Sequence, residues 1–494
     1  MAREASPSDS DGAFSYDELP YTGSLHPGAH PARAAGVARL FGVPAAHLES
    51  ARVLELGCAQ GDDLIALAAA FPGARFVGID LGRKHVEAAT AIARARGLEN
   101  VQFIQGDVAE LDGLGRFDYV IAHGLYSWVP EFVAEAMLAM CESTLSEHGV
   151  AYISYNTFPG WEELGLARAA LRAHVADIRS PREQVTAAHR FLAAFENSSA
   201  DDSLTRSLRR VATRIVTATD SYLFHEFLCE DNHPVLFEDF VQRAATHRLR
   251  YVGDVTPGGM WGRTPRGEMS RIAYEQRLDH EAKRSFRRSL LCHDAVAVRT
   301  SPDPEALRSL ALSTPLERRA DGSFTGPDGM VLWLAGDGIV SAMTQLSAAR
   351  GRPVPFAEAW CRFDDAATVV DDLLDLVHAG VVEVRAPEGP EASAVGKRPC
   401  AFAGARADLA DGHACVGGLR HVTVALDPIA RFLLEKLDGT RDRNDLVSAL
   451  LAAMERGDLT DLARPAFVRP SREDLFAQVD AWLEHAHASG LLVS

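Results

Sequence analysis

Apolar and polar positions follow two alternating periods between residues 51 and 156. Short apolar runs, typical of buried strands, occupy 52–56, 75–79, 101–105, 117–122 and 149–155. Between them, 62–71, 83–96 and 131–145 carry apolar residues at the spacing of a helix that buries one face. Strands alternating with helices predict a doubly wound, mostly parallel sheet, so the fold class we expect is α/β.

The pattern changes after residue 161. Long amphipathic helices are predicted over 164–178, 181–197, 204–217 and 237–247, followed by a mixed, loop-rich stretch to about 298. Beyond it, 369–384 and 474–493 each combine a helix with a short apolar strand, an order typical of winged-helix-like units. The domains we expect are a disordered segment 1–13, an α/β domain with an N-terminal preamble 14–160, a helical domain 161–298 and a winged-helix-like C-terminal domain 299–494.

Composition narrows the classes of partner. The 494 residues carry a formal net charge of −18, which argues against nucleic acid as the main partner because phosphate binding needs a basic surface. Seven cysteines are scattered without CxxC pairing, which predicts free thiols and no metal site. The N-terminus lacks the apolar core of a secretory signal, and no apolar run is long enough to span a membrane. We therefore expect a cytoplasmic protein.

The segment Val53–Gly61, with the sequence V-L-E-L-G-C-A-Q-G, is the strongest functional signal. It predicts a strand that enters a glycine-marked turn and then a helix. Glycine at 57 and 61 lets the backbone approach a ligand closely. The next strand ends on Asp80, where a carboxylate can accept both ribose hydroxyl hydrogens. This arrangement predicts a nucleoside site at the carboxyl ends of the strands.

The glycine spacing and the local charge separate two nucleoside ligands. NAD needs a pyrophosphate at the helix N-terminus, and here Asp62 and Asp63 follow Gly61 and would repel it. The pattern E-L-G-C-A-x-G instead resembles motif I of the class I S-adenosylmethionine (SAM) methyltransferases. SAM carries a sulfonium and an ammonium group, so the two carboxylates favour SAM over NAD.

The resemblance to motif I implies a set of cofactor contacts at four strand ends. We expect the methionine half beside Glu55 and the backbone of Gly57 and Ala59, with Gly61 allowing a close approach to the ligand. The ribose is expected on Asp80, the adenine against Leu81, Asp107 and Val108, and the methyl group near His123. Each residue also has an ordinary structural interpretation: turn glycines, an N-cap for Asp80 and a solvated loop acid for Asp107. Four such sites, in order and each at a predicted strand end, favour cofactor binding.

Further motifs resemble one family. They are Ala122–Pro130 (A-H-G-L-Y-S-W-V-P), Ser154–Trp161 (S-Y-N-T-F-P-G-W), Tyr16–Tyr21, Tyr222–Glu226 and Phe286–His293. Together with Val53–Leu64 they are similar to bacterial class I methyltransferases that carry a methyltransferase regulatory domain. That family includes rickettsial-type protein-lysine methyltransferases acting on outer-membrane proteins. The resemblance covers about 14–298 and is weaker beyond.

The resemblance implies transfer of a methyl group to a protein or peptide, with lysine nitrogen favoured. A small-molecule N- or O-methyltransferase is the alternative, and a non-catalytic SAM-binding module is a third hypothesis that the intact strand-end residues argue against. A homodimer is also compatible with the pattern. One departure is visible: the family pattern Gly-Gly-Asn-Leu is replaced here by Gly61-Asp62-Asp63-Leu64.

A neutral lysine acceptor needs a desolvated, aromatic-lined channel, because burial lowers the pKa of an amine. Our candidates for catalysis are Tyr126, Tyr155, Asn156 and His123, with His123 as a general base if the acceptor is a hydroxyl or carboxyl. Trp128 and Trp161 are further candidates for the channel wall, and Tyr16 and Tyr21 are candidates to close the channel from the N-terminal preamble. Core packing is the alternative for the aromatic residues, and a hydrogen-bonded loop histidine for His123.

Overall fold

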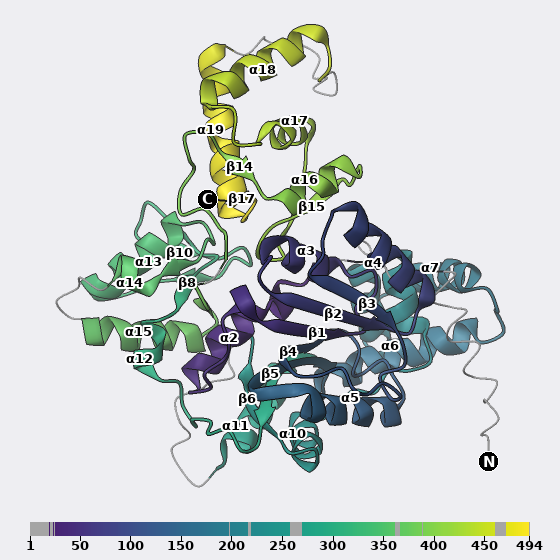
Figure 1. Ribbon diagram of the computed structural model, residues 1–494. Helices are drawn as coiled ribbons and strands as arrows, with labels where there is room; N and C mark the ends of the chain where they lie inside the picture. Colours follow the sequence, from purple (N-terminus) through teal and green to yellow (C-terminus); the bar gives the residue numbers. More distant parts are fainter. Residues whose placement is uncertain are drawn as a thin grey trace.

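A seven-stranded sheet forms the centre of the molecule (Figure 1). The computed structural model describes residues 19, 23, 25–196, 198–215, 219–256, 269–360, 366–387, 389–459 and 471–493. The strands of the sheet are β1 (Arg52–Leu56), β2 (Arg75–Asp80), β3 (Val101–Gln105), β4 (Phe117–Ala122), β5 (Leu145–Asn156), β6 (Leu249–Asp254) and β7 (Phe286–His293).

The strand order is β3-β2-β1-β4-β5-β7-β6. Strands β1 to β5 run parallel to one another, and β7 is antiparallel to both β5 and β6. The order reverses between β1 and β4, which is where a doubly wound sheet opens a crevice at the carboxyl ends of its strands. The α/β fold class expected from the sequence is confirmed, and the predicted site lies at this switch point.

Helices cover both faces of the sheet because residues of the central strands point alternately to either side. Val53 of β1 belongs to the core cluster that includes residues of α2 (Pro31–Leu40) and α3 (Asp62–Ala70). Leu54, the next residue, belongs to the cluster that includes α5 (Glu131–Thr144) and α10 (Phe237–Thr246). The central strands are therefore apolar on both sides, which is why they appear in the sequence as continuous apolar runs.

A helical layer follows β5 and forms its own core cluster around Trp161, Leu171 and Leu208. It comprises α6 (Gly160–Val175), α7 (Pro181–Glu196), α8 (Ser203–Ile215), α9 (Asp220–Leu223) and a π-helical turn, η3 (Phe224–Leu228). The four amphipathic helices predicted after residue 161 are present as α6, α7, α8 and α10, with ends shifted by a few residues.

Two strands and one helix of this region were missed by the sequence analysis. Strands β6 and β7 belong to the main sheet, and α11 (Arg271–Ala282) lies between them in the chain. The segment of β7 begins Phe-Arg-Arg-Ser, and Arg287 occupies a fully buried position. A charged residue facing the interior breaks the apolar pattern from which a strand is predicted.

The C-terminal region contains several small sheets. Strand β8 (Ala311–Ser313) lies between β12 (Val354–Pro355) and β13 (Glu383–Arg385), and a second sheet pairs β9 (Glu317–Arg318), β10 (Phe324–Thr325) and β11 (Val331–Leu332). The helices here are α12 (Pro304–Leu307), α13 (Asp337–Ala348), α14 (Phe356–Ala359) and α15 (Ala366–His378).

The last part of the chain has two further sheets, β14 (Cys400–Ala401) with β17 (Leu492–Val493), and β15 (Cys415–Gly417) with β16 (Thr423–Ala425). Its helices are α16 (Ala403–Ala410), α17 (Pro428–Lys436), α18 (Arg443–Arg456) and α19 (Arg472–Ala488). We call residues 400–493 the C-terminal lobe. Among the described residues, no helix is both long and apolar enough to cross a membrane.

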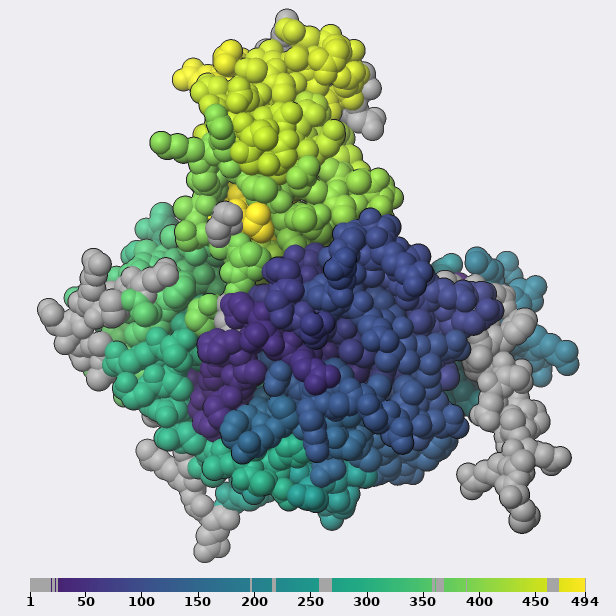
Figure 2. Space-filling model, in the orientation of Figure 1, coloured from purple at the N-terminus to yellow at the C-terminus, as the bar shows by residue number. Residues whose placement is uncertain are grey.

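The C-terminal lobe packs against the sheet domain beside α3, as Figure 2 shows for the green and yellow segment above the blue one. Arg96, after α4 (Arg83–Ala95), places its guanidinium 2.8 Å from Asp408 and 2.9 Å from Asp411. Near the start of the described chain, the short helix η1 (Pro27–Ala29) precedes α2, and η2 (Leu48–Ser50) precedes β1. The N-terminal segment, α3 and the C-terminal lobe thus converge near the carboxyl end of β1.

Candidate functional site

The turn after β1 has a backbone that needs glycine at two positions. Gly57 and Gly61 have φ values of 71° and 75°, and Ala59 between them also has a positive φ of 45°. A Cβ at Gly57 would come within 3.0 Å of the Leu125 side chain, and one at Gly61 within 2.5 Å of the Phe103 ring. The amides of Gly57 and Cys58 donate to the carbonyl of Ile79 at 2.8 and 3.0 Å. The turn is therefore tight and is held against the end of β2.

Asp80 joins the ends of β1 and β2. Its Oδ2 accepts a hydrogen bond from the Ala59 amide at 2.8 Å, and its Oδ1 accepts one from the Gly82 amide at 2.8 Å. The ring of His85 lies 3.3 Å from Oδ1. The N-cap of α4 is Gly82 and makes no side-chain cap, so the alternative in which Asp80 caps that helix is wrong. Asp80 instead fixes the shape of the glycine turn.

Glu55 is a buried carboxylate near other acids. It is 6% exposed, and its Oε2 makes no hydrogen bond to any residue that the structure describes. Burial raises the pKa of Glu55 well above its ordinary value, and the negative charges of Asp63, Asp62 and Asp80 raise it further. A carboxylate in this position is stabilised by a cationic ligand that supplies the missing hydrogen bond and charge.

The residues expected around the adenine lie after β2 and β3, which are neighbours in the sheet. Leu81 is 64% exposed, an unusual position for a leucine at the end of a buried strand. Asp107 is half-buried, and its Oδ1 accepts from the Ala109 amide at 2.8 Å, so its carboxylate is fixed in a turn. Val108 is half-buried beside it. An apolar surface and an acceptor are thus available at the same edge as Asp80.

His123 directly follows β4 and is the last of the predicted cofactor residues along the chain. Its Nδ1 lies 2.9 Å from the hydroxyl of Tyr152, and its ring centroid is 4.0 Å from that of His26. Burial, and then the positive charge of His26, lower the pKa of His123 to about 3. The ring is therefore neutral and only weakly basic at neutral pH, which disagrees with a general-base role and agrees with the alternative of a hydrogen-bonded histidine.

Tyr126 and Tyr155 lie in the core rather than along an open channel. Both are at most 2% exposed and pack against Phe240 of α10, with ring centroids 5.3 and 4.1 Å away. The Tyr155 hydroxyl lies 3.0 Å from the hydroxyl of Ser289 on β7. The expectation of a channel wall does not fit these positions, because Phe240 of α10 packs against both rings and β7 also contacts Tyr155.

The two tryptophans also pack together, with ring centroids 6.1 Å apart. Trp161 is buried, and Trp128 is half-buried with the Arg168 guanidinium 5.9 Å from its ring. This arrangement agrees with the core-packing alternative for Trp161. Tyr16 and Tyr21, expected to close the site, lie outside the described residues.

Asn156 is held at the end of β5 by two contacts. Its amide donates to the hydroxyl of Ser127 at 2.9 Å, and its Nδ2 donates to Oδ1 of Asn232 at 3.0 Å. The loop that follows is anchored to the segment before β7, where the amide of Gly160 donates to the Arg284 carbonyl at 2.9 Å. Asn156 thus has a fixed position next to Asn232 and the segment before β7.

Asp63, in the first turn of α3, contacts two histidines that were not predicted as site residues. The backbone amide of His26 lies 3.0 Å from Oδ1 of Asp63, and its Nδ1 lies 3.0 Å from Oδ2. The Nδ1 of His421, in the C-terminal lobe, lies 2.9 Å from Oδ1. Burial alone would raise the pKa of Asp63, but the positive charge of His421 and the contacts with both rings hold it well below its ordinary range.

No local pattern in the sequence predicts this cluster. The sequence shows Asp63 as an acid at the helix start and as a departure from the asparagine of the family pattern, and His421 is 358 positions away from it. Long-range contacts of this kind leave no periodicity.

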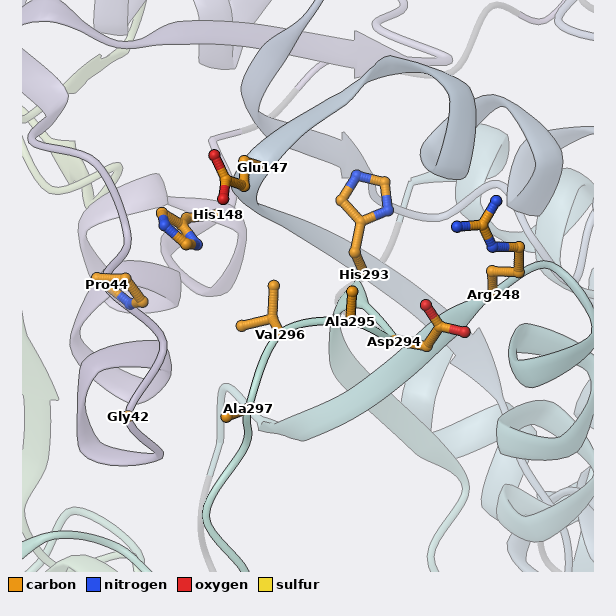
Figure 3. Close-up of a pocket in the computed structure, with 10 residues that line it drawn as sticks. All are labelled: Gly42, Pro44, Glu147, His148, Arg248, His293, Asp294, Ala295, Val296 and Ala297. Atoms are coloured by element: carbon orange, nitrogen blue, oxygen red, sulfur yellow. The ribbon is translucent and has the colours of Figure 1, made fainter.

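A separate cavity of about 360 Å³ lies at the opposite edge of the sheet (Figure 3). It is lined by residues at the beginning of β5 and after β7, among them Glu147, His148, His293 and Asp294. Because the carboxyl ends of β1 to β5 face the other edge, this cavity is not the predicted cofactor site. Among the described residues, no group of three or more His, Cys, Asp or Glu side chains could hold a metal ion.

Comparisons with known proteins agree with this architecture. Three family models match: "Methyltransferase domain" over residues 47–187, "Predicted methyltransferase regulatory domain" over 219–293, and "PKMT, C-terminal winged helix domain" over 397–487. An uncharacterized protein of Rickettsia prowazekii, RP028, is 32% identical over 47% of this chain and 94% of its own length. The chain belongs to the SAM-dependent methyltransferases with a regulatory domain.

Two other proteins, with lower sequence identity, resemble this chain over nearly its whole length. A second uncharacterized protein of Rickettsia prowazekii, RP789, is 27% identical over 94% of this chain and 90% of its own length. The structure of PKMT2 from Rickettsia typhi covers 96% of this chain and 100% of its own, with a TM-score of 0.82 and 22% identity. That protein has also been solved in complex with AdoHcy, with a TM-score of 0.82. The likeness shows a shared fold that includes the C-terminal region.

SAM is the cofactor of this methyltransferase, and the site fits its charge. Oε2 of the buried Glu55 makes no hydrogen bond to a described residue, and Asp62, Asp63 and Asp80 lower the local potential, so this edge of the sheet favours a cation. SAM carries a sulfonium and an ammonium, whereas NAD would bring a pyrophosphate to the same helix start. NAD, the alternative nucleoside, is therefore excluded.

Proposed function

We propose that this methyltransferase transfers the methyl group of SAM to a lysine nitrogen of a protein or peptide. The cofactor would lie along the carboxyl ends of β1 to β4. Glu55 and the backbone of Gly57, Ala59 and Gly61 would face the methionine half. Asp80 would accept from the ribose, and Leu81, Asp107 and Val108 would surround the adenine.

The observation that carries the choice of acceptor is the state of His123. A hydroxyl acceptor must lose its proton as it attacks, so an O-methyltransferase benefits from a competent base beside the methyl group. His123 is the titratable residue expected there, and its pKa of about 3 makes it a poor base. An amine needs no base in the transfer step if it arrives neutral, and burial beside a sulfonium lowers its pKa.

Deprotonating a lysine with a pKa of about 10.4 at pH 7 costs roughly 4–5 kcal/mol. The site can meet this cost only by desolvation, because the transfer itself requires little more than alignment of the nitrogen with the methyl carbon and sulfur. The helical layer α6–α9 and the C-terminal lobe would then exclude water and hold the polypeptide. The similarity to a winged helix domain described for PKMT supports a polypeptide acceptor.

The test is transfer of radiolabelled methyl from SAM into a cell extract, followed by protease digestion and sizing of the product. We expect label in macromolecular material that becomes small after protease treatment and yields methyllysine on acid hydrolysis. Label in small molecules before digestion would support the small-molecule alternative instead. The control is the Asp80→Ala variant, which should bind SAM more weakly and transfer far less label at a low SAM concentration.

A further inference from the structure

His421 brings the C-terminal lobe into direct contact with the cofactor edge of the sheet. Its side chain is 1% exposed, and its Nδ1 lies 2.9 Å from Oδ1 of Asp63, an ion-pair contact in which the N–H is not aligned for a hydrogen bond. Asp63 is in the first turn of α3, directly after the glycine turn, and its charge raises the pKa of Glu55. A residue more than 350 positions away thus contacts the carboxylate next to the proposed methionine site.

The loop that carries His421 is held on both sides. Within the C-terminal lobe, the Leu419 amide donates to the Gly490 carbonyl at 2.9 Å, and the Gly418 amide donates to the Val422 carbonyl at 2.9 Å. Toward the sheet domain, Nε2 of His30 lies 3.1 Å from the Leu419 carbonyl, and the rings of His30 and His421 are 4.8 Å apart. The loop is therefore held in a defined position between the C-terminal lobe and the sheet domain.

The same carboxylate also holds the N-terminal segment. His26 contacts both oxygens of Asp63, and its ring lies against His123 at the end of β4. Asp63 thus has one partner in the N-terminal segment, His26, and one in the C-terminal lobe, His421. Through these three side chains the C-terminal lobe is connected to His123, the residue nearest the proposed methyl position. We call these three residues the Asp63 cluster.

We propose that the C-terminal lobe completes the cofactor site by supplying His421 as a positioning residue, which holds Asp63 and His26 in place for SAM. The inference rests on the proposed placement of SAM at the strand ends. It implies that docking of the lobe and binding of the cofactor are coupled, so each stabilises the other by the same factor. The proposed role of His421 does not depend on which molecule accepts the methyl group.

The test compares the affinity for SAM of full-length variants by calorimetry. In His421→Leu the contact with Asp63 is lost, and we expect SAM to bind about tenfold or more weakly, with KM for SAM raised and kcat little changed. His421→Asn keeps an N–H near the position of Nδ1 and should restore binding to within about threefold, whereas His421→Gln places its amide near Nε2 and should not. His485→Leu, an exposed histidine on α19, is the matched control.

A double-mutant cycle separates action through Asp63 from a general loss of packing. In an Asp63→Asn background, His421→Leu should cost much less affinity than in the wild type. Hydrogen exchange provides the reciprocal measurement: SAM should increase protection of residues 417–422 in the wild type and not in His421→Leu. If His421→Leu does not fold, the comparison of His421→Asn with His421→Gln carries the test.

Equal affinity for SAM in His421→Asn and His421→Gln, or additive effects in the cycle, would overturn the proposal. Asp80→Ala keeps this outcome distinct from a failure of the SAM placement. If Asp80→Ala loses SAM and the His421 variants do not, the placement stands and the role of His421 falls. If none of these variants changes the affinity, the placement itself is wrong.

Discussion

At the scale of single residues, the site is organised by carboxylates whose partners differ. Asp80 is engaged by backbone amides, Asp63 by two histidines, and Glu55 by no described residue through its Oε2. The first two shape the turn and the helix start, and the third is the carboxylate that we propose faces the ligand. These roles follow from hydrogen-bond partners, which residue type alone does not reveal.

Asp80→Ala should remove both the proposed ribose acceptor and the bond that holds Ala59. A hydrogen bond to a charged group contributes about 1.5–3 kcal/mol, so SAM affinity should fall by roughly 10- to 150-fold, and further if the turn loosens. Calorimetric titration with SAM measures the loss. Ser146→Ala, which removes a hydrogen bond to Asp118 at the opposite edge, is a control that should bind SAM normally. Wild-type affinity in Asp80→Ala would contradict the ribose assignment.

Glu55 should make both stability and cofactor binding depend on pH. Its pKa is raised in the folded chain, so the folded state holds its proton at pH values where the unfolded state has lost it. The free energy of unfolding without SAM therefore falls as pH rises from the unfolded pKa through the raised pKa. A cationic ligand needs the ionised form, so SAM affinity should rise over the same window.

Glu55→Gln should remove both dependences. We expect a higher melting temperature than the wild type without SAM at about pH 8, together with SAM affinity reduced about tenfold. Thermal unfolding with and without SAM, at about pH 5.5 and pH 8, measures both effects. A variant that binds SAM as tightly as the wild type at the higher pH would show that Glu55 does not contact the cofactor.

Sequence reasoning located the residues of the glycine turn because their constraint is local. Gly57 and Gly61 need positive φ, and Asp80 follows at a strand end, so a short pattern contains the information. The interpretation of Tyr126 and Tyr155 did not fit the structure, since their positions depend on Phe240 and Ser289, which approach from later segments. The histidines of the Asp63 cluster were missed for the same reason.

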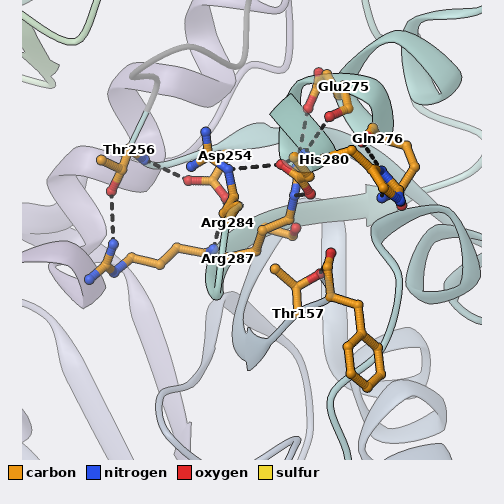
Figure 4. Close-up of polar contacts among 12 residues, drawn as sticks. Thr157, Asp254, Thr256, Glu275, Gln276, His280, Arg284 and Arg287 are labelled. Atoms are coloured by element: carbon orange, nitrogen blue, oxygen red, sulfur yellow. Dashed lines mark hydrogen bonds and ion pairs between the residues drawn. The ribbon is translucent and has the colours of Figure 1, made fainter. Parts of the chain in front are cut away.

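At the scale of elements, a buried ion-pair network holds α11 to β7 (Figure 4). The Arg287 guanidinium contacts Asp279 at 2.7 and 3.0 Å and Glu275 at 3.2 Å, and all three side chains are 0% exposed. Arg284 adds a second contact to Asp279 at 2.8 Å. The network fixes the segment that anchors the loop after Asn156, and so connects the regulatory region to the site.

Arg287→Met should destabilise the fold strongly, because Glu275 and Asp279 stay buried with less compensation. Removing one partner of a buried ion pair costs about 3–5 kcal/mol. The exposed pair of Arg277 with Glu281 on the same helix provides the control, and Arg277→Met should change stability by less than about 1 kcal/mol. Urea unfolding of the two variants measures the difference, and equal midpoints would mean that the network contributes no net stability.

The elements of the parallel half of the sheet were predictable, and those of the antiparallel half were not. Strands β1, β2 and β4 bury apolar residues on both faces, so each is visible as a run. Strand β7 carries the buried Arg287, whose charge is balanced only by residues of α11. The sequence of β7 alone does not show that residues of α11 neutralise the charge of Arg287, so β7 was not predicted as a strand.

At the scale of the whole molecule, the N-terminal segment and the C-terminal lobe meet at the start of α3, beside the edge where we propose that SAM binds. The sheet supplies the strand ends, the N-terminal segment supplies His26, and the C-terminal lobe supplies His421. The sequence predicts the order of the domains along the chain. It does not show that the C-terminal domain packs against the first domain. The winged-helix-like character of the C-terminal region was predictable, and its contact with α3 was not.

The central claim is that the carboxyl ends of β1 to β4 hold SAM, with Glu55, Asp80 and Asp107 around it. The most direct test is a crystal structure of the full chain with S-adenosylhomocysteine. We predict density for the ribose within hydrogen-bond distance of Asp80, for the adenine beside Leu81 and Asp107, and for the amino group near Glu55. Density for the ligand elsewhere, such as in the cavity beside Glu147 and His293, would contradict the account.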